Sequence, residues 1–540
     1  HLSIRRQRQM CIRDSPKGER FTMRITNKIM QNNSLYNINN NKILQDKLST
    51  QMSTQKAITR PSDDPVVAIR ALRLRSSVSE LTQYYKKNAP DAQSWIEVTG
   101  KGLSTVTDIL TDMNRQANKG ANKDYTSSEL SIIVKQLQSL RDEFYATGNL
   151  DYAGRYVFTG YRTDTTMTFT KGEVEETKPD YVIHEQGTMA DFDSINYTYT
   201  ANLDGMNASN YDQKNVIEQD VVNGDIHRIR LAYNQVERFD GIELVDKDGK
   251  KHNHTADTVS TTADPDPYKT IQDANKDGKE KIVFVPETGE VLFSDKAYEK
   301  INTEAGAISG SETEIRMNYK KSKWEVGDLR PEHYFACEGT TTKNGVTKTV
   351  SYNEEYLEGK KEKQSIEYDV GYNQKIEVNT TAEEVFNHNP DRDVDDLVTA
   401  LASLEKIEST WTDLKKVLSG LDEGTADYKE VQTKLEAADK AFSYIRENIH
   451  DLMQHTITSI QQYLDDTNVA ITDNGTRESR LDLISNRLMD QQTTFKTLQS
   501  ENEDVDIADV TIQLTSTKLT YDAALMATGK IMQTSLMNYI

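Results

Sequence analysis

The chain has 540 residues and a formal net charge of −21, from 65 Lys and Arg against 86 Asp and Glu. This charge argues against nucleic acid or an anionic membrane as the main partner, because both would repel the protein. Only 36% of the residues are hydrophobic, and no run approaches the roughly 18 apolar residues of a membrane-spanning helix. The length suits roughly two to four domains, and the low hydrophobic content predicts long helices with much exposed surface.

Residues 1–22 are expected to be a leader that is not native to the fold. They contain six Lys or Arg and lack the apolar centre of a secretory signal, and Met23 offers a natural start. The chain has two cysteines, Cys11 and Cys337. A disulfide framework is therefore not expected.

Helical patterning dominates from Met23 to about residue 122 and is interrupted at residues 59–65. The interruption predicts a helix start, with Ser62, Asp63 or Asp64 as the N-cap and Pro65 at the first helical position. Apolar residues then occupy two heptad positions over residues 67–113, which predicts a helix on the order of 70 Å long with a kink at Pro90. A second helix is predicted at residues 127–144.

From about residue 156 to residue 385 the pattern changes to alternating apolar and polar residues in short runs. Turn signals separate these runs at residues 247–249, 288–289 and 344–345. This pattern predicts a β-rich insertion between two helical arms.

Helical patterning returns near Val394 and continues to the end of the chain. Apolar seams run over residues 428–463 and 481–498, and the segment between them is expected to be a plain turn. The last seam alternates steps of three and four, at Ile507, Val510, Leu514, Thr517, Tyr521, Ala524, Thr528 and Ile531. Its threonines and small residues make this helix marginal alone, so it needs a partner.

Because helices at both ends enclose one excursion, we expect residues 23–60 to lie beside residues 505–540. The expected contacts, which also form the predicted assembly interface, involve Leu44, Leu48, Met52, Leu514, Tyr521, Leu525 and Ile531. The predicted fold class is therefore α+β, with long paired terminal helices in an elongated bundle or coiled coil and a β-rich domain inserted between them.

Two segments offer metal ligands without completing a site. Asp273, Asn275, Asp277 and Gly278 match the first half of a calcium loop, but Phe284 stands where the bidentate Glu is required, so an Asp-rich hairpin turn is favoured. His252 and His254 have no third ligand at a suitable spacing and are expected to face solvent.

Residues 471–480 contain a single Gly475 and lack the further glycines and the Lys of a phosphate-binding loop. No catalytic, cofactor-binding or metal-binding residue is predicted. Arg60, Arg70, Arg73 and Arg75 form a basic cluster that is either a solvated helix face or a contact to an acidic surface on a neighbouring subunit. The two interpretations stay open.

The stretch MRITNKIM through SDDPVVAIRALRLR resembles the N-terminal part of the bacterial flagellin superfamily, and within it of the hook–filament junction proteins. Residues 154–169 resemble the segment that leaves the helical domain of that family, residues 366–386 the returning segment, and residues 474–488 with the terminal helix the return arm. The resemblance covers about residues 23–165 and 366–540. The size of the insertion and Pro90 depart from the family pattern.

The resemblance implies a structural adapter at the junction of hook and filament, not an enzyme. It implies export without a cleaved signal, an extracellular place in the flagellum, and assembly as a homo-oligomeric ring. The implied partners are a neighbouring hook-associated protein, flagellin and an export chaperone, with no cofactor. Alternatives are flagellin itself, or a secreted surface-binding protein or enzyme with its activity in the insertion.

By this resemblance, residues 23–60 with 505–540 form an inner terminal-helix layer. Residues 61–165 with 390–504 form a helical bundle layer, and residues 166–389 form an outward insertion.

Overall fold

The computed structural model describes residues 27–123, 125–245, 250–305, 314–343, 346–358 and 361–533. The expected leader and the expected turns at residues 247–249 and 344–345 lie outside this range. The chain divides into two compact units, a terminal unit of residues 1–83 with 487–540 and a central unit of residues 84–486. Each unit is described by itself.

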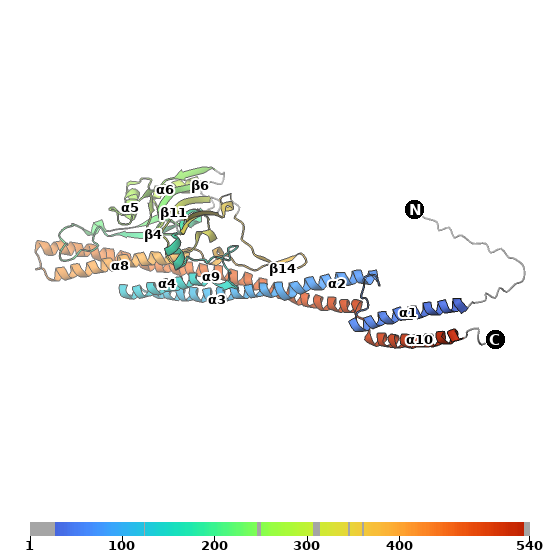
Figure 1. Ribbon diagram of the computed structural model, residues 1–540. Coiled ribbons are helices and arrows are strands. Elements are labelled where there is room, and N and C mark those ends of the chain that lie inside the picture. Colours follow the sequence, from blue (N-terminus) through green and yellow to red (C-terminus); the bar gives the residue numbers. More distant parts are fainter. Residues whose placement is uncertain are drawn as a thin grey trace, which may run out of the picture. The chain divides into compact units, whose positions relative to one another are not determined.

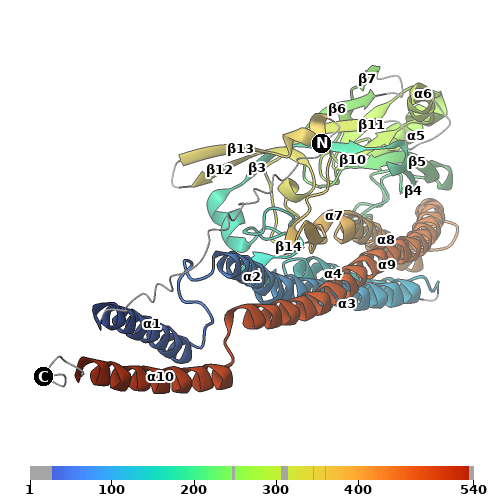
Figure 2. The same ribbon diagram turned by 90° about the vertical axis from the view of Figure 1, so that its right-hand side faces the viewer.

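In the terminal unit, α1 (Asn27–Thr54) packs along α10 (Ile507–Gln533), and both views show the two helices side by side (Figures 1 and 2). The two helices run antiparallel: the end of α1 lies beside the start of α10, where Val505 N donates to Gln55 O. The buried positions of α10 are Val510, Thr517 and Thr528, with half-buried residues between them. The predicted pairing of the terminal helices is confirmed. The predicted seam of α10 lies on its buried side from Val510 to Thr528, whereas Ile507 at its start is 46% exposed.

The central unit begins with a π-helical turn at Tyr84–Asn88, which separates α2 (Pro65–Gln83) from α3 (Ala89–Gly120). The single helix predicted over residues 67–113 is therefore interrupted by a wider turn just before Pro90, and the predicted kink stays a prediction. Pro90 has no N–H to donate to the carbonyl four residues earlier, so the chain adopts π geometry and α3 restarts with Pro90 in its first turn. The helix predicted at 127–144 is α4 (Ser127–Thr147), which Thr126 and Glu129 cap reciprocally.

The returning helices are α8 (Asn389–Ser419) and α9 (Ala426–Glu503), and α9 is continuous through residues 471–480. The plain turn expected there is wrong. Asn474 is buried and its Nδ2 donates to Ile96 O at 3.0 Å, while Thr472 and Thr476 bond to carbonyls four residues earlier. A single Gly475 costs a helix only about 1 kcal/mol, too little to break one that is packed on α3.

Two sheets of the insertion lie on one side of these helices (Figures 1 and 2). The order β13-β12-β3-β11-β6-β7 forms an antiparallel six-stranded sheet, and β4-β5-β10-β9-β8 forms a five-stranded sheet in which only β8 and β9 are parallel. The predicted β-rich insertion is confirmed. Its strands pair across long stretches of sequence, as where β3 lies between β11 and β12.

The strands of the six-stranded sheet are β3 (Asp180–Gly187), β6 (Arg238–Val245), β7 (Lys251–His254), β11 (Glu314–Lys321), β12 (Ala336–Lys343) and β13 (Val346–Tyr352). Those of the five-stranded sheet are β4 (Phe192–Tyr199), β5 (Val222–Arg230), β8 (Asp257–Thr258), β9 (Ile282–Val285) and β10 (Glu290–Phe293). Two hairpins pair β1 (Asp151–Tyr152) with β2 (Arg155–Tyr156), and β14 (Glu367–Gly371) with β15 (Gln374–Glu377).

The insertion also contains helices that the alternating pattern did not predict: α5 (Pro267–Asp277), α6 (Asp295–Glu304) and the single turn α7 (Ala382–Val385). α5 packs Tyr268 and Ile271 against Val283, Val285 and Leu292 of the five-stranded sheet. The predicted turn at 288–289 joins β9 to β10, where Gly289 has a φ of +71°. Among the described residues, no helix is long and apolar enough to cross a membrane.

Candidate assembly surface and the joint of the insertion

The paired helices α1 and α10 each carry a second apolar stripe that faces away from the buried seam. On α1 the stripe consists of Ile29, Tyr36 and Ile43, which are 50–68% exposed, and on α10 of Ile512, Leu519 and Met526, which are 67–72% exposed. Each set recurs every seven residues, so each forms a line along one side of its helix. We call these six residues the outward stripes. Large apolar side chains in contiguous exposed lines are typical of protein–protein contact surfaces.

The predicted interface residues differ in how far they are buried. Leu48 is buried, and Leu514 and Tyr521 are half-buried, so they belong to the seam of the pair. Leu44, Met52 and Leu525 are exposed, each by 42–44%. The side chain of Ile531 lies outside the described residues. A heptad pattern does not reveal whether a helix packs against its own chain or against another copy. The sequence therefore could not separate the buried residues from the exposed ones.

α2 begins at Pro65, and Asp64 is its N-cap. Asp64 Oδ1 accepts hydrogen bonds from the backbone N of Val66 at 3.0 Å and of Val67 at 3.1 Å. Asp63 closes the preceding turn by accepting from the N of Arg60. Ser62 makes no such cap contact within the described part of the chain. The side chain nearest the helix therefore satisfies the amides that α2 leaves unpaired at its start.

Glu503, the last residue of α9, fastens the terminal unit together. Its two carboxylate oxygens accept from Nε and Nη2 of Arg75 on α2 at 2.7 and 2.6 Å, and its backbone O accepts from Ala57 N. Lys56 lies 3.7 Å from the same carboxylate and 2.5 Å from Asp504. The bond to Arg75 and its charge lower the pKa of Glu503. Of the predicted basic cluster, Arg75 thus has an acidic partner within its own chain.

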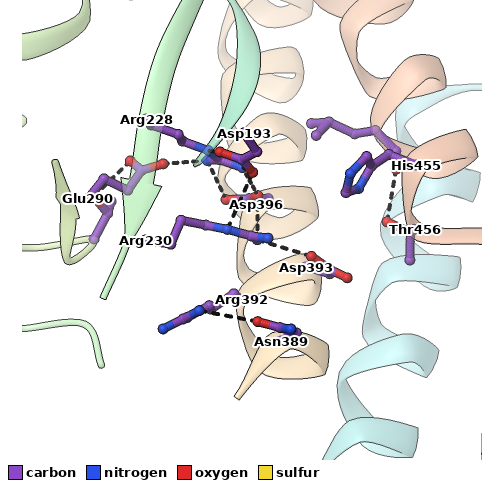
Figure 3. Close-up of polar contacts among 12 residues, drawn as sticks. Asp193, Arg228, Arg230, Glu290, Asn389, Arg392, Asp393, Asp396, His455 and Thr456 are labelled. Atoms are coloured by element: carbon purple, nitrogen blue, oxygen red, sulfur yellow. Dashed lines mark hydrogen bonds and ion pairs between the residues drawn. The ribbon is translucent and has the colours of Figure 1, made fainter. Parts of the chain in front are cut away.

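A buried ion cluster joins the insertion to α8 within the central unit (Figure 3). Arg228 of β5 is 3% exposed and contacts Asp193 of β4 at 2.9 Å, Asp396 of α8 at 2.6 Å, and Glu290 of β10. Arg230 contacts Asp393 and Asp396 at 3.0 and 3.2 Å. We call these six residues the joint cluster. Their distances are those of charge-assisted hydrogen bonds, so the cluster fixes the five-stranded sheet on the first turns of α8.

The charges in the joint cluster hold one another ionised. Burial alone would raise the pKa of Asp396, but the adjacent Arg228 and Arg230 outweigh it and lower that pKa. Burial also opposes the charge of Arg228, yet Asp396, Glu290 and Asp193 raise its pKa well above the ordinary value. Tyr463 of α9 donates to Asp393 at 2.6 Å. The cluster is therefore a structural clamp, because its polar atoms are committed to each other.

Beside the joint cluster, a single arginine faces two aspartates, so the negative charges there are less fully compensated. Arg141 of α4 lies 2.9 Å from Asp391 and 3.0 Å from Asp395 of α8. Burial, together with the neighbouring charge of Asp395, raises the pKa of Asp391 to about 6. These residues line a cavity of about 760 Å³ between α4, α8 and the insertion.

The segments considered for metal binding adopt other structures. Asp273, Asn275 and Asp277 lie in α5, and Gly278 is its left-handed C-cap with a φ of +62°, so both the calcium loop and the hairpin turn are wrong. The reason is local: Asp266 caps the start of α5 and Gly278 ends it. Their side chains pair with neighbours such as Lys269 and Asp295.

His252 and His254 do not face solvent, contrary to expectation. Both lie on one face of β7 and point to Glu304 at the end of α6, with His254 Nε2 2.7 Å and His252 Nδ1 3.7 Å from its Oε2. The sequence did not show this because α6 was not predicted. Among the described residues, no group of three or more His, Cys, Asp or Glu is arranged to hold a metal ion.

Sequence reasoning missed the joint cluster altogether. Its members lie up to two hundred residues apart, and only the run PDRDVDDL at residues 390–397 hinted at it. The helix dipole stabilises acidic residues in the first turns of a helix. Four aspartates in eight residues also need cationic partners when they are buried. The outward stripes were also missed, because each of these helices carries two apolar lines and the more regular one alone predicted a seam.

Comparisons with known proteins find relatives for the N-terminal part of the chain. The family model of the bacterial flagellin N-terminal helical region matches residues 25–163. Flagellar hook-associated protein 3 of Salmonella typhimurium is 30% identical over 143 residues, and its Escherichia coli K12 counterpart is 28% identical over 144 residues; each match covers 26% of this chain and 45% of the relative. A flagellin of Clostridium tyrobutyricum is 28% identical over 127 residues, which are 24% of this chain and 33% of that protein.

The chain spans about half the length of the curated hook-associated relatives it matches. Solved structures of FlgL from Xanthomonas campestris and of hook-associated protein 3 from Legionella pneumophila align with 79% of this chain, and with 99% and 97% of theirs. Their identities are 12% and 10% and their TM-scores 0.29 and 0.28, values too low to carry an argument. Over its residues 25–163, the chain is therefore similar to the N-terminal helical region of bacterial flagellins.

Proposed function

We propose that this protein is a structural adapter at the junction between the hook and the filament of the bacterial flagellum. The observation that carries the proposal is the pair α1 and α10 with its outward stripes. The seam between the two helices is already filled within one chain, yet six large apolar side chains remain exposed. Such a pair gains by packing against further copies, because burying each large apolar side chain contributes about 1.5–3 kcal/mol.

The proposed arrangement follows from this packing. Residues 23–60 and 505–540 form an inner layer of paired helices, residues 61–165 and 390–504 the next layer, and residues 166–389 an outward insertion. The partners are further copies in a ring, a neighbouring hook-associated protein and flagellin. The chain is exported without a cleaved signal, and an export chaperone receives its terminal helix in an apolar groove.

The match to hook-associated protein 3 in two bacteria supports the adapter, and the match to a flagellin favours the second candidate, the filament subunit itself. The two roles differ in stoichiometry. An adapter contributes a fixed number of copies to each filament, whereas a filament subunit contributes copies in proportion to filament length.

The test combines a deletion strain with quantification. Cells lacking this protein are examined by electron microscopy, and the protein is quantified in purified filaments that have been sheared to different lengths. The adapter predicts intact hooks without filaments in the deletion strain, and a signal that follows filament ends rather than filament mass. Filaments on hooks without this protein would contradict both roles, and a signal proportional to mass would establish the filament subunit.

A further inference from the structure

α2 presents an exposed face that combines apolar and basic side chains. Val66, Ile69 and Leu72 are 67%, 55% and 62% exposed, and Arg70 and Arg73 are exposed between them. Unlike Arg75, which is held by Glu503, neither of these arginine side chains forms an ion pair or hydrogen bond within the described part of the chain. We call these five residues the α2 basic face.

α9 presents a face of opposite charge. Asp465, Asp466 and Asp473 are exposed on it and flank Val469, which is 65% exposed. The sequence has no Lys or Arg between Arg446 and Arg477, and these carboxylates make no ion pair with the described residues. Burial and the neighbouring charge of Asp465 raise the pKa of Asp466. We call these four residues the α9 acidic face.

The two faces match in spacing as well as in charge. Val66, Ile69, Arg70 and Arg73 are separated by three, one and three residues, and Asp466, Val469 and Asp473 by three and four. Each set therefore spans two turns on one side of its helix, about 10 Å. Two such helices can place Arg70 and Arg73 beside the carboxylates while Val469 packs among the apolar residues of α2.

We propose that the α2 basic face of one copy docks on the α9 acidic face of a second copy. Since the two faces are different surfaces of the same chain, the contact is head-to-tail and repeats from copy to copy. The inference rests on the proposed function, because it requires many copies to meet. It adds which surfaces meet outside the inner helices, and it makes charge pairing the source of their register.

The experiment reverses each face separately and then together. Arg70→Glu with Arg73→Glu gives a reversed α2, and Asp466→Lys with Asp473→Lys gives a reversed α9. Each variant replaces the protein in a deletion strain, and filament-bearing cells are counted by electron microscopy. Each single-face reversal is expected to lower that count by about tenfold or more, because like charges then face each other at every repeat.

The combined variant, with both faces reversed in one chain, is expected to restore filaments to near the wild-type count. Co-production of the two single-face variants in one cell is expected to restore filaments as well, because each then offers the face that the other needs. Normal filaments from either single-face variant would overturn the proposal. The proposal would also be overturned if the combined variant gave no more filament-bearing cells than either single-face variant.

A matched control reverses two exposed lysines of the hairpin β12–β13, Lys343 and Lys348, to glutamate. This control changes the net charge as much as the reversed α2 does, and its filament count is expected to stay at the wild-type level. A fall as large as that of the reversed α2 would assign the effect to net charge and overturn the proposal. If wild-type protein itself makes no difference to filaments in the deletion strain, the proposed function fails, whereas loss of the charge-swap pattern alone refutes only this inference.

Discussion

At the scale of single residues, Glu503 links α9, α2 and the connector at Lys56. Replacing Glu503 with Gln keeps the shape but removes the charge that Arg75 and Lys56 face. We expect the terminal unit to lose about 1–2 kcal/mol, at the lower part of the range for hydrogen bonds to charged groups because Arg75 is 56% exposed. Urea unfolding followed by circular dichroism measures the change. Glu501→Gln, an exposed residue two positions earlier, should leave the midpoint unchanged, and an equal effect of both would contradict the clamp.

The lowered pKa of Glu503 also fixes the sign of its pH dependence. The folded state releases this proton more readily than the unfolded chain does. The stabilisation is therefore fully present above the ordinary carboxyl pKa of about 4.3 and is lost as the pH falls through the lowered value. The stability difference between wild type and Glu503→Gln should accordingly shrink below about pH 4.

Asp391 contributes a pH dependence of stability with the opposite sign, because burial and the charge of Asp395 raise its pKa to about 6. Its folded state binds the proton more tightly than the unfolded chain, so the stability of wild type relative to Asp391→Asn should rise as the pH falls from 7.5 to 5. The expected rise is about 1 kcal/mol, because only about one pH unit of this interval lies below the folded pKa and the Asp391 side chain is 40% exposed. Urea unfolding of both proteins at each pH measures it.

The other groups facing Asp391, namely Arg141, Arg392 and Lys321, are common to wild type and variant and cancel in this difference. The same holds for His388, whose pKa is lowered by burial. A difference that stays flat with pH would show that Asp391 is already ionised and fully compensated.

Neither carboxylate could have been assigned this behaviour from the sequence. Glu503 follows a helical seam like any polar residue, and its partners lie in a segment more than four hundred positions earlier. Asp391 is one of four aspartates in a short run, and only the positions of Arg141, Arg228 and Arg230 decide which of them are well paired. Burial and partner geometry set pKa values, and neither is encoded locally.

At the scale of elements, the joint cluster should decide whether the insertion stays on α8. Arg228→Met keeps much of the side-chain volume but leaves Glu290 without a cation and leaves Asp193 and Asp396 with Arg230 alone. Breaking a buried pair on one side costs about 3–5 kcal/mol, so the central unit should unfold at lower urea and the insertion should become sensitive to protease. Arg238→Met, at an exposed ion pair with Asp240 in β6, is the matched control with an expected loss below about 1 kcal/mol. Similar losses in both variants would contradict the assignment of the clamp to Arg228.

The continuity of α9 gives a second prediction at this scale. Gly475 lies inside the helix, and a methyl group added there would meet no atom within 4 Å apart from its chain neighbours and the adjacent backbone of α9. Gly475→Ala should therefore stabilise the central unit by about 0.5–1 kcal/mol. Gly475→Pro should destabilise it by about 3 kcal/mol or more. Thermal unfolding distinguishes these results. If Gly475→Ala destabilised the protein, this would contradict a continuous α9 and favour the turn expected from the sequence.

Elements with strong local signals could be predicted, and those defined by distant partners could not. The steps of three and four from Val510 to Thr528 identify the seam of α10, and Asp64 with Pro65 marks the start of α2. The order of strands around β3 depends on pairing with segments more than a hundred residues away, which alternation alone does not specify. Residues 471–480 were misassigned because Asn and Gly are weak helix formers, and the packing of Asn474 on α3 outweighs that preference.

At the scale of the whole molecule, the contacts that complete the fold lie on other surfaces than those proposed for assembly. The seam of α1 and α10, the Glu503 clamp and the joint cluster complete the fold within one chain. The outward stripes, the α2 basic face and the α9 acidic face remain exposed in it. A single chain therefore leaves apolar and charged side chains exposed that are available for the proposed assembly.

The most direct test of this separation is the count of filament-bearing hooks in cells whose only copy carries Ile512→Asp and Leu519→Asp. Both residues lie on the outward stripe of α10 and are 68% and 67% exposed. We predict that the free energy of unfolding of the purified variant stays within about 0.5 kcal/mol of the wild-type value. We also predict loss of filaments from the hooks, because each copy would bury unpaired carboxylates. Val510→Asp, on the buried seam, should instead lower the stability of the terminal unit. Filaments at the wild-type count on hooks built with the stripe variant would contradict the account.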